Sequence, residues 1–286
     1  MTPVVILKFG GEVVADAVAL SGMLADVATL SARGFRFVLC HGGGPQAGAL
    51  STRLRLETVK VAGQRVTDAA TLQVMKQTLA GEVSVDVVAA AVTAGVRAVG
   101  ISGVSDGLVT ASRRPPVVVG RGGSGSVDYG LVGDIERIRP ELLRHLWAGG
   151  FVPVVNTLGL GTEPSPDGLA RQVYNINADT VAATLAGVLK ADHLMLVTDV
   201  GGVLRDKDDP ATRISRLTAQ QARDAIADGT VVGGMIPKIE EALDNLAAGI
   251  GAVHIVPPGA GVIQHAIEHP GRYGTVLVAD PEHADG

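Results

Sequence analysis

The chain has 286 residues, of which 47% are hydrophobic and 19% charged, so it can bury a sizeable core. Its 24 basic and 29 acidic residues leave a formal net charge of −5, and no run of Lys and Arg is long enough to follow a phosphate backbone. We therefore expect no nucleic-acid partner. No segment approaches ~20 uninterrupted apolar residues, and the first residues lack the pattern of a secretion signal, so we expect a cytoplasmic protein without a membrane partner.

Short β-branched and aliphatic runs alternate with segments of helix length. The runs cover residues 4–9, 37–40, 98–101, 152–155, 194–197 and 253–256. In the segments between them, apolar residues recur at helical spacing, as in Leu20, Leu24, Val27 and Leu30. Because runs that are apolar throughout are typical of strands buried on both faces, this alternation predicts a doubly wound α/β fold with a parallel sheet and helices on both faces.

Two stretches break the alternation. Residues 109–129 contain Val117 to Val119 followed by several glycines among serines, which predicts a hairpin with a mobile loop. Gly, Pro, Ser and Thr cluster in residues 158–168 without apolar periodicity, which predicts a boundary between two lobes. The single cysteine, Cys40, ends an apolar run, and we interpret it as a buried structural thiol.

Two Gly-rich turns follow the first two predicted strands. Lys8 ends the first strand and precedes Gly10 and Gly11; because ligands bind beyond the carboxyl ends of strands, this motif can meet a phosphate, although a surface lysine at a tight turn is the alternative. Residues 41–46, with the sequence HGGGPQ, follow the second strand and open a helix. Three successive glycines before a helix start favour anion binding, while His41 is interpreted as structural rather than as a base.

Two polar motifs precede predicted helices. In GQRVTD, residues 63–68, Arg65 stands just before a helix capped by Thr67 or Asp68, where it either clamps a carboxylate or forms an ordinary surface salt bridge. In NINAD, residues 175–179, capping explains Asn177 and leaves Asn175 on the same face unexplained.

Two further Gly-rich motifs lie in the C-terminal half. TDVGGV, residues 198–203, follows a predicted strand, and GGMIPK, residues 233–238, precedes a predicted helix. A nucleotide can lie along the first motif while Lys238 reaches its phosphates from the second. A plain loop and a plain helix cap are the alternatives.

Taken in order, KFGG, HGGGPQ, GQRVTD, NINAD, TDVGGVL and GGMIPK resemble the amino acid kinase family, and the resemblance runs from Lys8 to YGTVLV at residues 273–278. It implies one amino acid kinase domain over residues 1–286 with a three-layer α/β/α sandwich around a mostly parallel sheet. Within that domain, residues up to about 168 are expected to bind an acylated amino acid and to form a homodimer, and residues from about 169 to 280 to bind ATP.

The resemblance also implies roles for individual positions. Lys8 and Lys238 are expected to stabilise the transferring phosphoryl group, and Asp179 to orient both ammonium groups. No protein metal ligand is implied, because Mg²⁺ is expected to be held mainly by ATP phosphates and water. The positions expected to bind the acylated amino acid are Gly43, Gly44, Arg65, Asn175 and Asn177, and those expected to bind the nucleotide are Gly10, Gly11, Asp199, Gly201, Gly202, Gly234 and Met235.

The implied reaction is the ATP-dependent phosphorylation of the γ-carboxylate of N-acetyl-L-glutamate, or of a related acyl amino acid, in arginine biosynthesis. A side-chain carboxylate with a pKa of about 4.3 is already ionised at neutral pH, so the nucleophile needs no general base. The chemical problem is to bring one anion to another, which calls for ammonium groups, helix N-termini and Mg²⁺. The two lysines and the Gly-rich turns fit that need.

Two other functions stay open. A kinase for a carrier-protein-linked aminoadipate or glutamate in lysine biosynthesis needs a cationic surface, which Arg113, Arg114 and Arg121 can supply. A non-catalytic nucleotide or amino acid sensor of the same fold is the second, although both lysines are present. Since no helical extension precedes Val4, the element by which hexameric, arginine-inhibited relatives interlock, we expect a dimer that is insensitive to arginine.

Overall fold

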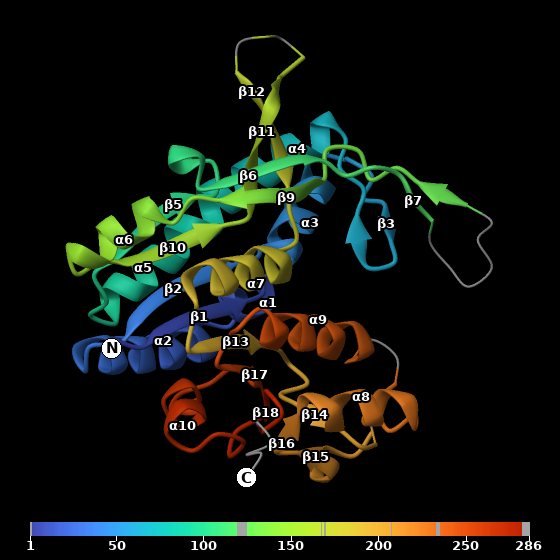
Figure 1. The fold of residues 1–286 in the computed structure, drawn as a ribbon. Helices are drawn as coiled ribbons and strands as arrows, with labels where there is room; N and C mark the ends of the chain where they lie inside the picture. The colour runs from blue at the N-terminus through green and yellow to red at the C-terminus, as the bar shows by residue number, and fades with distance from the viewer. Residues whose placement is uncertain are drawn as a thin grey trace.

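The computed structural model describes residues 2–118, 125–166, 168, 170–206, 208–232 and 235–281. These residues contain a large central sheet with β1 (Val4–Phe9), β2 (Arg36–His41), β5 (Ala98–Ser102), β10 (Val152–Asn156), β13 (His193–Val197), β16 (Arg216–Thr218), β17 (Ala252–Val256) and β18 (Thr275–Val278). Its eight strands follow the order β16-β18-β17-β13-β1-β2-β10-β5 (Figure 1). All neighbours are parallel except β17 and β18. The six predicted strands and the mostly parallel sheet are confirmed.

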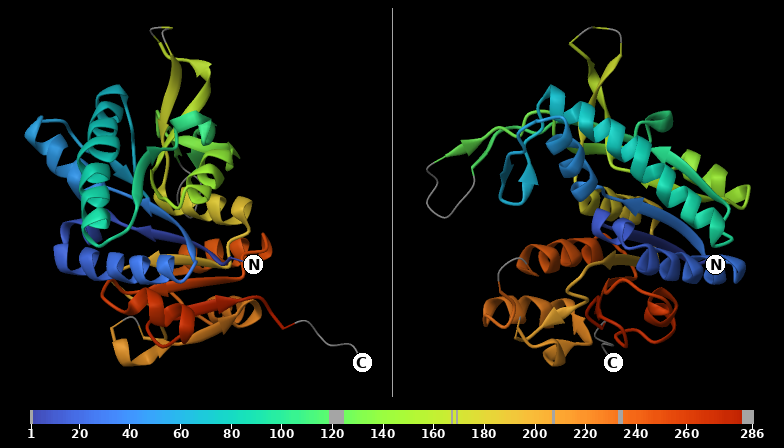
Figure 2. Two further views of the ribbon diagram at one scale, coloured as in Figure 1. Left: turned by 90° about the vertical axis from the view of Figure 1, so that its left-hand side faces the viewer. Right: turned by 180° about the vertical axis from the view of Figure 1, so that it is seen from behind.

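Helices cover both faces of this sheet. Alternate residues of β1 divide between the two faces, with Val5 and Leu7 in one apolar core and Ile6 in the other. The first core also takes residues from α2 (Ala17–Ala32), α5 (Ser84–Thr93) and α10 (Val262–Glu268). The second takes residues from α6 (Glu141–Ala148), α7 (Ala178–Leu189), α8 (Ala219–Ala227) and α9 (Met235–Ala247). The fold is therefore the expected three-layer α/β/α sandwich (Figure 2).

A second sheet, which the sequence did not predict, lies beside the first. Its strands are β6 (Val109–Arg113), β9 (Gly133–Ile138), β11 (Leu158–Pro164) and β12 (Arg171–Asn175), in the order β12-β11-β6-β9. β11 occupies much of the stretch in which we expected a lobe boundary, and the division into two lobes stays a prediction. The predicted hairpin is present as β7 (Val117–Val118) paired antiparallel with β8 (Ser126–Val127), and residues 119–124 of its loop lie outside the described residues.

The remaining elements are short. In the N-terminal half they are α1 (Gly11–Ala15), α3 (Gly44–Arg53), β3 (Lys60–Val61), β4 (Gln64–Arg65), α4 (Ala69–Met75), a π-helical segment (Lys76–Val83) and the 3₁₀ turn Ser105–Gly107. In the C-terminal half they are β14 (Val203–Leu204), the 3₁₀ turn Pro210–Thr212 and β15 (Arg213–Ile214). Within the described ranges, no helix combines the length and apolarity needed to cross a bilayer.

The strand order reverses at β1. From β1 the chain continues to β2 on one side, whereas β13 is reached much later and pairs with β1 on the other side. Open α/β sheets bind ligands in the crevice that forms at such a switch point, beyond the carboxyl ends of the strands. The fold therefore predicts that ligand-binding residues lie in the segments that follow Phe9, His41 and Val197.

Candidate active site

A cavity of about 230 Å³ lies at the switch point, and we call it the β1–β13 cavity. The ends of both strands line it, with Lys8 and Gly10 from β1 and Asp199 just after β13. Lys238 reaches the same cavity from the first turn of α9. The structure thereby brings together four of the residues that the sequence predicted at the nucleotide and the phosphoryl group. The full lining is Lys8, Gly10, Glu12, Val13, Val197, Thr198, Asp199, Val200 and Lys238.

Lys8 of β1 forms an ion pair with Asp179 in the first turn of α7, the helix that covers this face of the sheet. In the alternation of β1, Lys8 falls on the side of Ile6, which faces α7. Its Nζ lies 2.7 Å from Oδ1 of Asp179, and the two side chains are only 15% and 27% exposed. Asn177 caps α7 by accepting a hydrogen bond of 3.0 Å from the Asp179 backbone N–H, which fixes the start of the helix. Among the described ion pairs, Asp179 joins Lys8 and not Lys238.

Two acidic residues that the sequence analysis missed belong to this site. Glu12 lines the β1–β13 cavity, with Oε2 only 2.5 Å from where a Cβ on Gly10 would be. Glu241 follows Lys238 by three residues on α9, which places both on one helix face. Burial, and next the charge of Asp179, raise the pKa of Glu241 to about 7, while Lys8 and Lys238 act in the opposite direction. The Lys-x-x-Glu spacing was the local signal for this residue.

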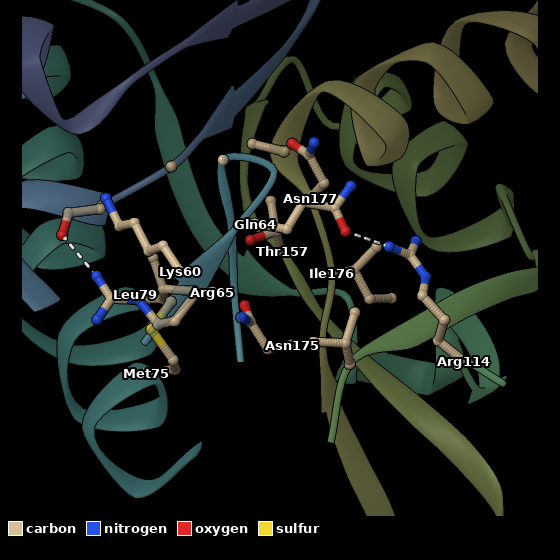
Figure 3. Close-up of a pocket in the computed structure, with 16 residues that line it drawn as sticks. Lys60, Gln64, Arg65, Met75, Leu79, Arg114, Thr157, Asn175, Ile176 and Asn177 are labelled. Carbon is tan, nitrogen blue, oxygen red and sulfur yellow. Dashed lines mark hydrogen bonds between the residues drawn. The ribbon is translucent and has the colours of Figure 1, made fainter. Parts of the chain in front are cut away.

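A second cavity, of about 220 Å³, opens beside the β3–β4 hairpin, and we call it the β3–β4 cavity (Figure 3). It collects all five positions expected to bind the acylated amino acid: Gly43, Gly44, Arg65, Asn175 and Asn177. The N-terminal ends of α3 and α7 contribute to it through Gly44 and Ala178. No side chain caps the start of α3, so its first backbone N–H groups and its helix dipole suit an anion.

Arg65 is held in place at one wall of this cavity. Its Nη2 donates to the Gly44 carbonyl at 3.2 Å and its Nη1 to Thr58 Oγ1 at 3.1 Å. Desolvation by burial lowers the pKa of this guanidinium from its ordinary value. Asn175, which capping did not explain, donates to Thr67 Oγ1 at 3.2 Å and stands in the same wall.

Figure 3 draws Arg114 on the side of the cavity away from Arg65. Arg114 donates from Nη1 to Gln64 Oε1 at 2.5 Å and from Nε to Asp134 Oδ1 at 2.7 Å. The sequence analysis assigned no role to Lys60 or Gln64 and placed Arg114 only at a carrier surface, yet all three line the cavity. They come from hairpin and strand positions whose proximity depends on tertiary folding.

Comparison with known proteins identifies the family. Residues 3–257 match the family model described as the amino acid kinase family. The acetylglutamate kinase of Sorangium cellulosum (strain So ce56) is 48% identical over 274 residues, a match covering 96% of this chain and 94% of that relative. The chain belongs to the amino acid kinase family.

Other relatives of this amino acid kinase agree. The acetylglutamate kinase of Anaeromyxobacter dehalogenans (strain 2CP-1) is 46% identical over 277 residues, covering 96% of this chain and 99% of that relative. Among solved structures, smu.665 from Streptococcus mutans UA159 has a TM-score of 0.75 and 27% identity, covering 98% of this chain and 100% of that chain. The family membership agrees with the expected α/β/α sandwich.

The Gly-rich turns of this amino acid kinase pack against each other. A Cβ on Gly11 would lie 2.3 Å from Gln46 Oε1 and 3.0 Å from the Cα of Gly43, and Gln46 Nε2 donates to the Gly11 carbonyl at 2.8 Å. Glycine at these positions is thus required for close approach of the two turns. By contrast, a Cβ on Gly44 would meet nothing within 4 Å, so this glycine borders open space in the β3–β4 cavity.

Three other predicted nucleotide-binding positions, Gly201, Gly202 and Met235, are not part of the cavity lining. Gly201 and Gly202 have φ values of +66° and +151°, so the turn after β13 itself requires glycine there. Met235 packs against the apolar core beneath α9, and Gly234 lies outside the described residues. Nucleotide contacts for these four residues and for Gly11 stay predictions.

The two reactive side chains next to the site are buried and unsuited to proton transfer. Burial raises the pKa of the Cys40 thiol to about 12, which bears out its interpretation as a structural residue. Burial also lowers the pKa of His41, whose Nδ1 lies 3.0 Å from the Gly42 carbonyl. Neither side chain is therefore suited to act as a general base at the site.

Two of the three arginines considered for binding a carrier protein form ion pairs within the chain. Arg113 forms an ion pair of 2.8 Å with Asp128, and Arg114 one of 2.7 Å with Asp134. Arg121, the third arginine of that hypothesis, lies outside the described residues. No observation on the described residues favours a carrier-linked acceptor over a free amino acid.

Proposed function

We propose that this amino acid kinase transfers the γ-phosphoryl group of ATP to the γ-carboxylate of N-acetyl-L-glutamate, as a step of arginine biosynthesis. The observation that carries the chemistry is the Lys8–Asp179 ion pair. Lys8 lines the β1–β13 cavity, and Asp179 directly follows Ala178, which lines the β3–β4 cavity. A phosphoryl group that passes between the two cavities has an oriented ammonium group beside it. The choice of acceptor is supported by the acetylglutamate kinases to which the chain is similar.

The β3–β4 cavity suits a small dicarboxylate that carries an acyl group. Arg65 is placed to bind the α-carboxylate, because a guanidinium offers two parallel N–H donors to such a group. Asn175 supplies an amide for the acetamido group, and Met75 and Leu79 offer apolar surface to its methyl group. The N-terminus of α7, capped by Asn177, directs its positive end toward the remaining carboxylate.

The transfer itself needs charge stabilisation rather than proton abstraction. The γ-carboxylate is ionised at neutral pH because its pKa is about 4.3. Lys8, held by Asp179, and Lys238, at the start of α9, are placed to stabilise the negative charge that spreads over the phosphoryl oxygens.

ATP and Mg²⁺ fit the residues of the β1–β13 cavity. Its two ammonium groups suit the phosphates, and the carboxylates of Glu12 and Asp199 are oxygen donors of the kind that Mg²⁺ binds directly or through water. Mg²⁺ carried by ATP neutralises charge on the β- and γ-phosphates.

We propose further that the protein is a homodimer joined at the β5 edge of the sheet. β5 is the terminal strand of the central sheet, so its outer edge pairs with no described strand of its own chain. α5, which packs on β5, exposes Val85 and Val92 by 63% and 56%. Light scattering coupled to gel filtration tests this assembly, and a Val85→Lys, Val92→Lys double variant is expected to run as a monomer. A wild-type protein of single-chain mass would contradict it.

A panel of acceptors tests the proposed reaction. Acyl phosphates are trapped with hydroxylamine in the presence of ATP and Mg²⁺, with N-acetylglutamate, N-acetylaspartate, free glutamate and carrier-linked aminoadipate compared side by side. N-acetylglutamate is expected to give the highest kcat/KM. A higher value with carrier-linked aminoadipate, or no turnover with any acceptor, would overturn the assignment.

A further inference from the structure

Helix α10 carries a cluster of metal-ligating side chains on the opposite face of the sheet from α7 and α9. Figure 1 shows α10 below α2. Val262, Ile263 and Ala266 of this helix are buried in the core shared with α2. His265 is half-buried, whereas Glu268 and His269 are exposed. One potential ligand atom from each of these three residues lies within 4.8 Å of the other two. The spacing of four residues between the histidines places them one helical turn apart.

His265 has a ring nitrogen that lacks a hydrogen bond. Its Nδ1 is buried and neither accepts nor donates a hydrogen bond within the described part of the chain. Its ring stacks with that of His269 at a centroid distance of 6.1 Å and with that of Tyr273 at 5.3 Å. These contacts hold the imidazole in place without satisfying its polar atom. A buried polar group without a partner is costly, so this nitrogen calls for a partner that the described residues do not supply.

Glu268 is oriented by hydrogen bonds from its neighbours. Arg33, which follows α2, donates from Nη1 to Oε1 at 2.5 Å, and Gln264 Nε2 lies 3.2 Å from Oε1 and 3.3 Å from Oε2. Since Arg33 occupies Oε1, Oε2 retains lone pairs for another cation.

We propose that His265, Glu268 and His269 bind a divalent transition-metal ion of the Zn²⁺ class, with water completing its coordination. Two imidazoles and one carboxylate form a ligand set that Zn²⁺ and Ni²⁺ accept and that Mg²⁺ disfavours. Bond lengths of about 2.0–2.2 Å require tetrahedral ligand atoms roughly 3.3 Å apart. The present separation of up to 4.8 Å would be closed mainly by rotation of the exposed His269 side chain, because Glu268 is held by Arg33 and Gln264.

The site lies apart from the two cavities of the kinase. α10 packs on α2 and β17, and none of the cluster's three residues lines the β1–β13 or β3–β4 cavity. His269 terminates α10, where the negative end of the helix dipole favours a cation. A metal bound to Glu268 would lie next to the Arg33–Glu268 ion pair that links α10 to the end of α2. Because it binds the folded chain, it would also raise the free energy of unfolding.

Metal titration of the full-length chain tests the proposal. Untagged protein, freed of metals with a chelator and returned to buffer containing Mg²⁺, is titrated with ZnCl₂ or NiCl₂ by isothermal calorimetry. We expect one ion per chain and a Tm that rises with added Zn²⁺. His269→Gln, which removes an exposed ligand, should weaken binding at least about tenfold. The matched control is His145→Gln, since His145 is an exposed histidine of α6 outside the cluster.

The exposed variant decides the outcome, because its side chain can be exchanged without disturbing the core. Weakened binding and a lost Tm shift in His269→Gln, with both retained in His145→Gln, support the site. His265→Gln is expected to show the same loss. Equal Zn²⁺ affinity in wild type and His269→Gln would overturn the proposal, as would wild-type protein that takes up no Zn²⁺ in the presence of Mg²⁺.

Discussion

Glu241 makes the folding stability of the protein depend on pH in a direction opposite to that of most carboxylates. Its pKa of 4.5 in the unfolded chain rises to about 7 in the folded one, first because of burial and then because of Asp179. Below pH 4.5 the carboxyl is protonated in both states. As the pH rises from about 4.5 to about 7, the unfolded chain loses a proton that the folded chain keeps, so this residue lowers stability progressively.

The Glu241→Gln variant removes this titration while it keeps the shape of the side chain. At pH 8 we expect it to be more stable than wild type by about 1–2 kcal/mol, a value reduced from the full linkage because the carboxyl is partly open to solvent. Below about pH 4.5 that pH-dependent gain should be absent. Urea unfolding between pH 4.5 and 8 measures the difference, with Glu240→Gln as the exposed control on the same helix. A difference that is constant with pH, or that favours wild type at pH 8, would refute the reasoning.

Three other variants or reagents test separate parts of the structure. Arg65→Ala should raise KM for N-acetylglutamate roughly 10–100-fold in the hydroxylamine-trapping assay, because a charged hydrogen-bond partner is lost. An unchanged KM would exclude Arg65 from the acceptor site. Asp26, which is 6% exposed, accepts three backbone N–H bonds at the start of α10. Asp26→Ala should therefore lose about 2–3 kcal/mol in urea unfolding, whereas a loss below about 0.5 kcal/mol would contradict that role. Cys40 should react with a thiol reagent only after unfolding, since burial raises its pKa to about 12, and rapid labelling of the native protein would show that it is accessible.

The central sheet could be predicted from local sequence because its strands are buried on both faces. Residues 4–7 and 194–197 read as uninterrupted apolar runs for that reason. β11 could not be predicted in the same way, because Leu158–Pro164 contains glycines and a proline and owes its strand conformation to pairing with β12 and β6. Pairing of this kind depends on residues distant in sequence and leaves no local periodicity.

The residues of the candidate site likewise divide into those with a local sequence signal and those brought together only by tertiary contacts. The turn at Gly43 and Gly44 and the helix cap at Asn177 were predicted because turn and cap residues have local signatures, whereas their role at the acceptor came from the family resemblance. Gln64 and Arg114 were missed as partners because their hydrogen bond joins residues 50 positions apart, and no spacing in the sequence signals it. Residues that satisfy each other across tertiary contacts become visible only in the folded chain.

The two lysines of the β1–β13 cavity provide the most direct test of carboxylate phosphorylation without a base. Hydroxamate-trapped turnover of N-acetylglutamate is measured for wild type, Lys8→Met and Lys238→Met, with Lys190→Met as a control at an exposed lysine beyond α7. Each site variant should lose roughly 10² or more in kcat, while the control retains wild-type turnover, because each removes one donor that stabilises the transferring phosphoryl group. Turnover within a few-fold of wild type in either site variant would contradict the proposed mechanism.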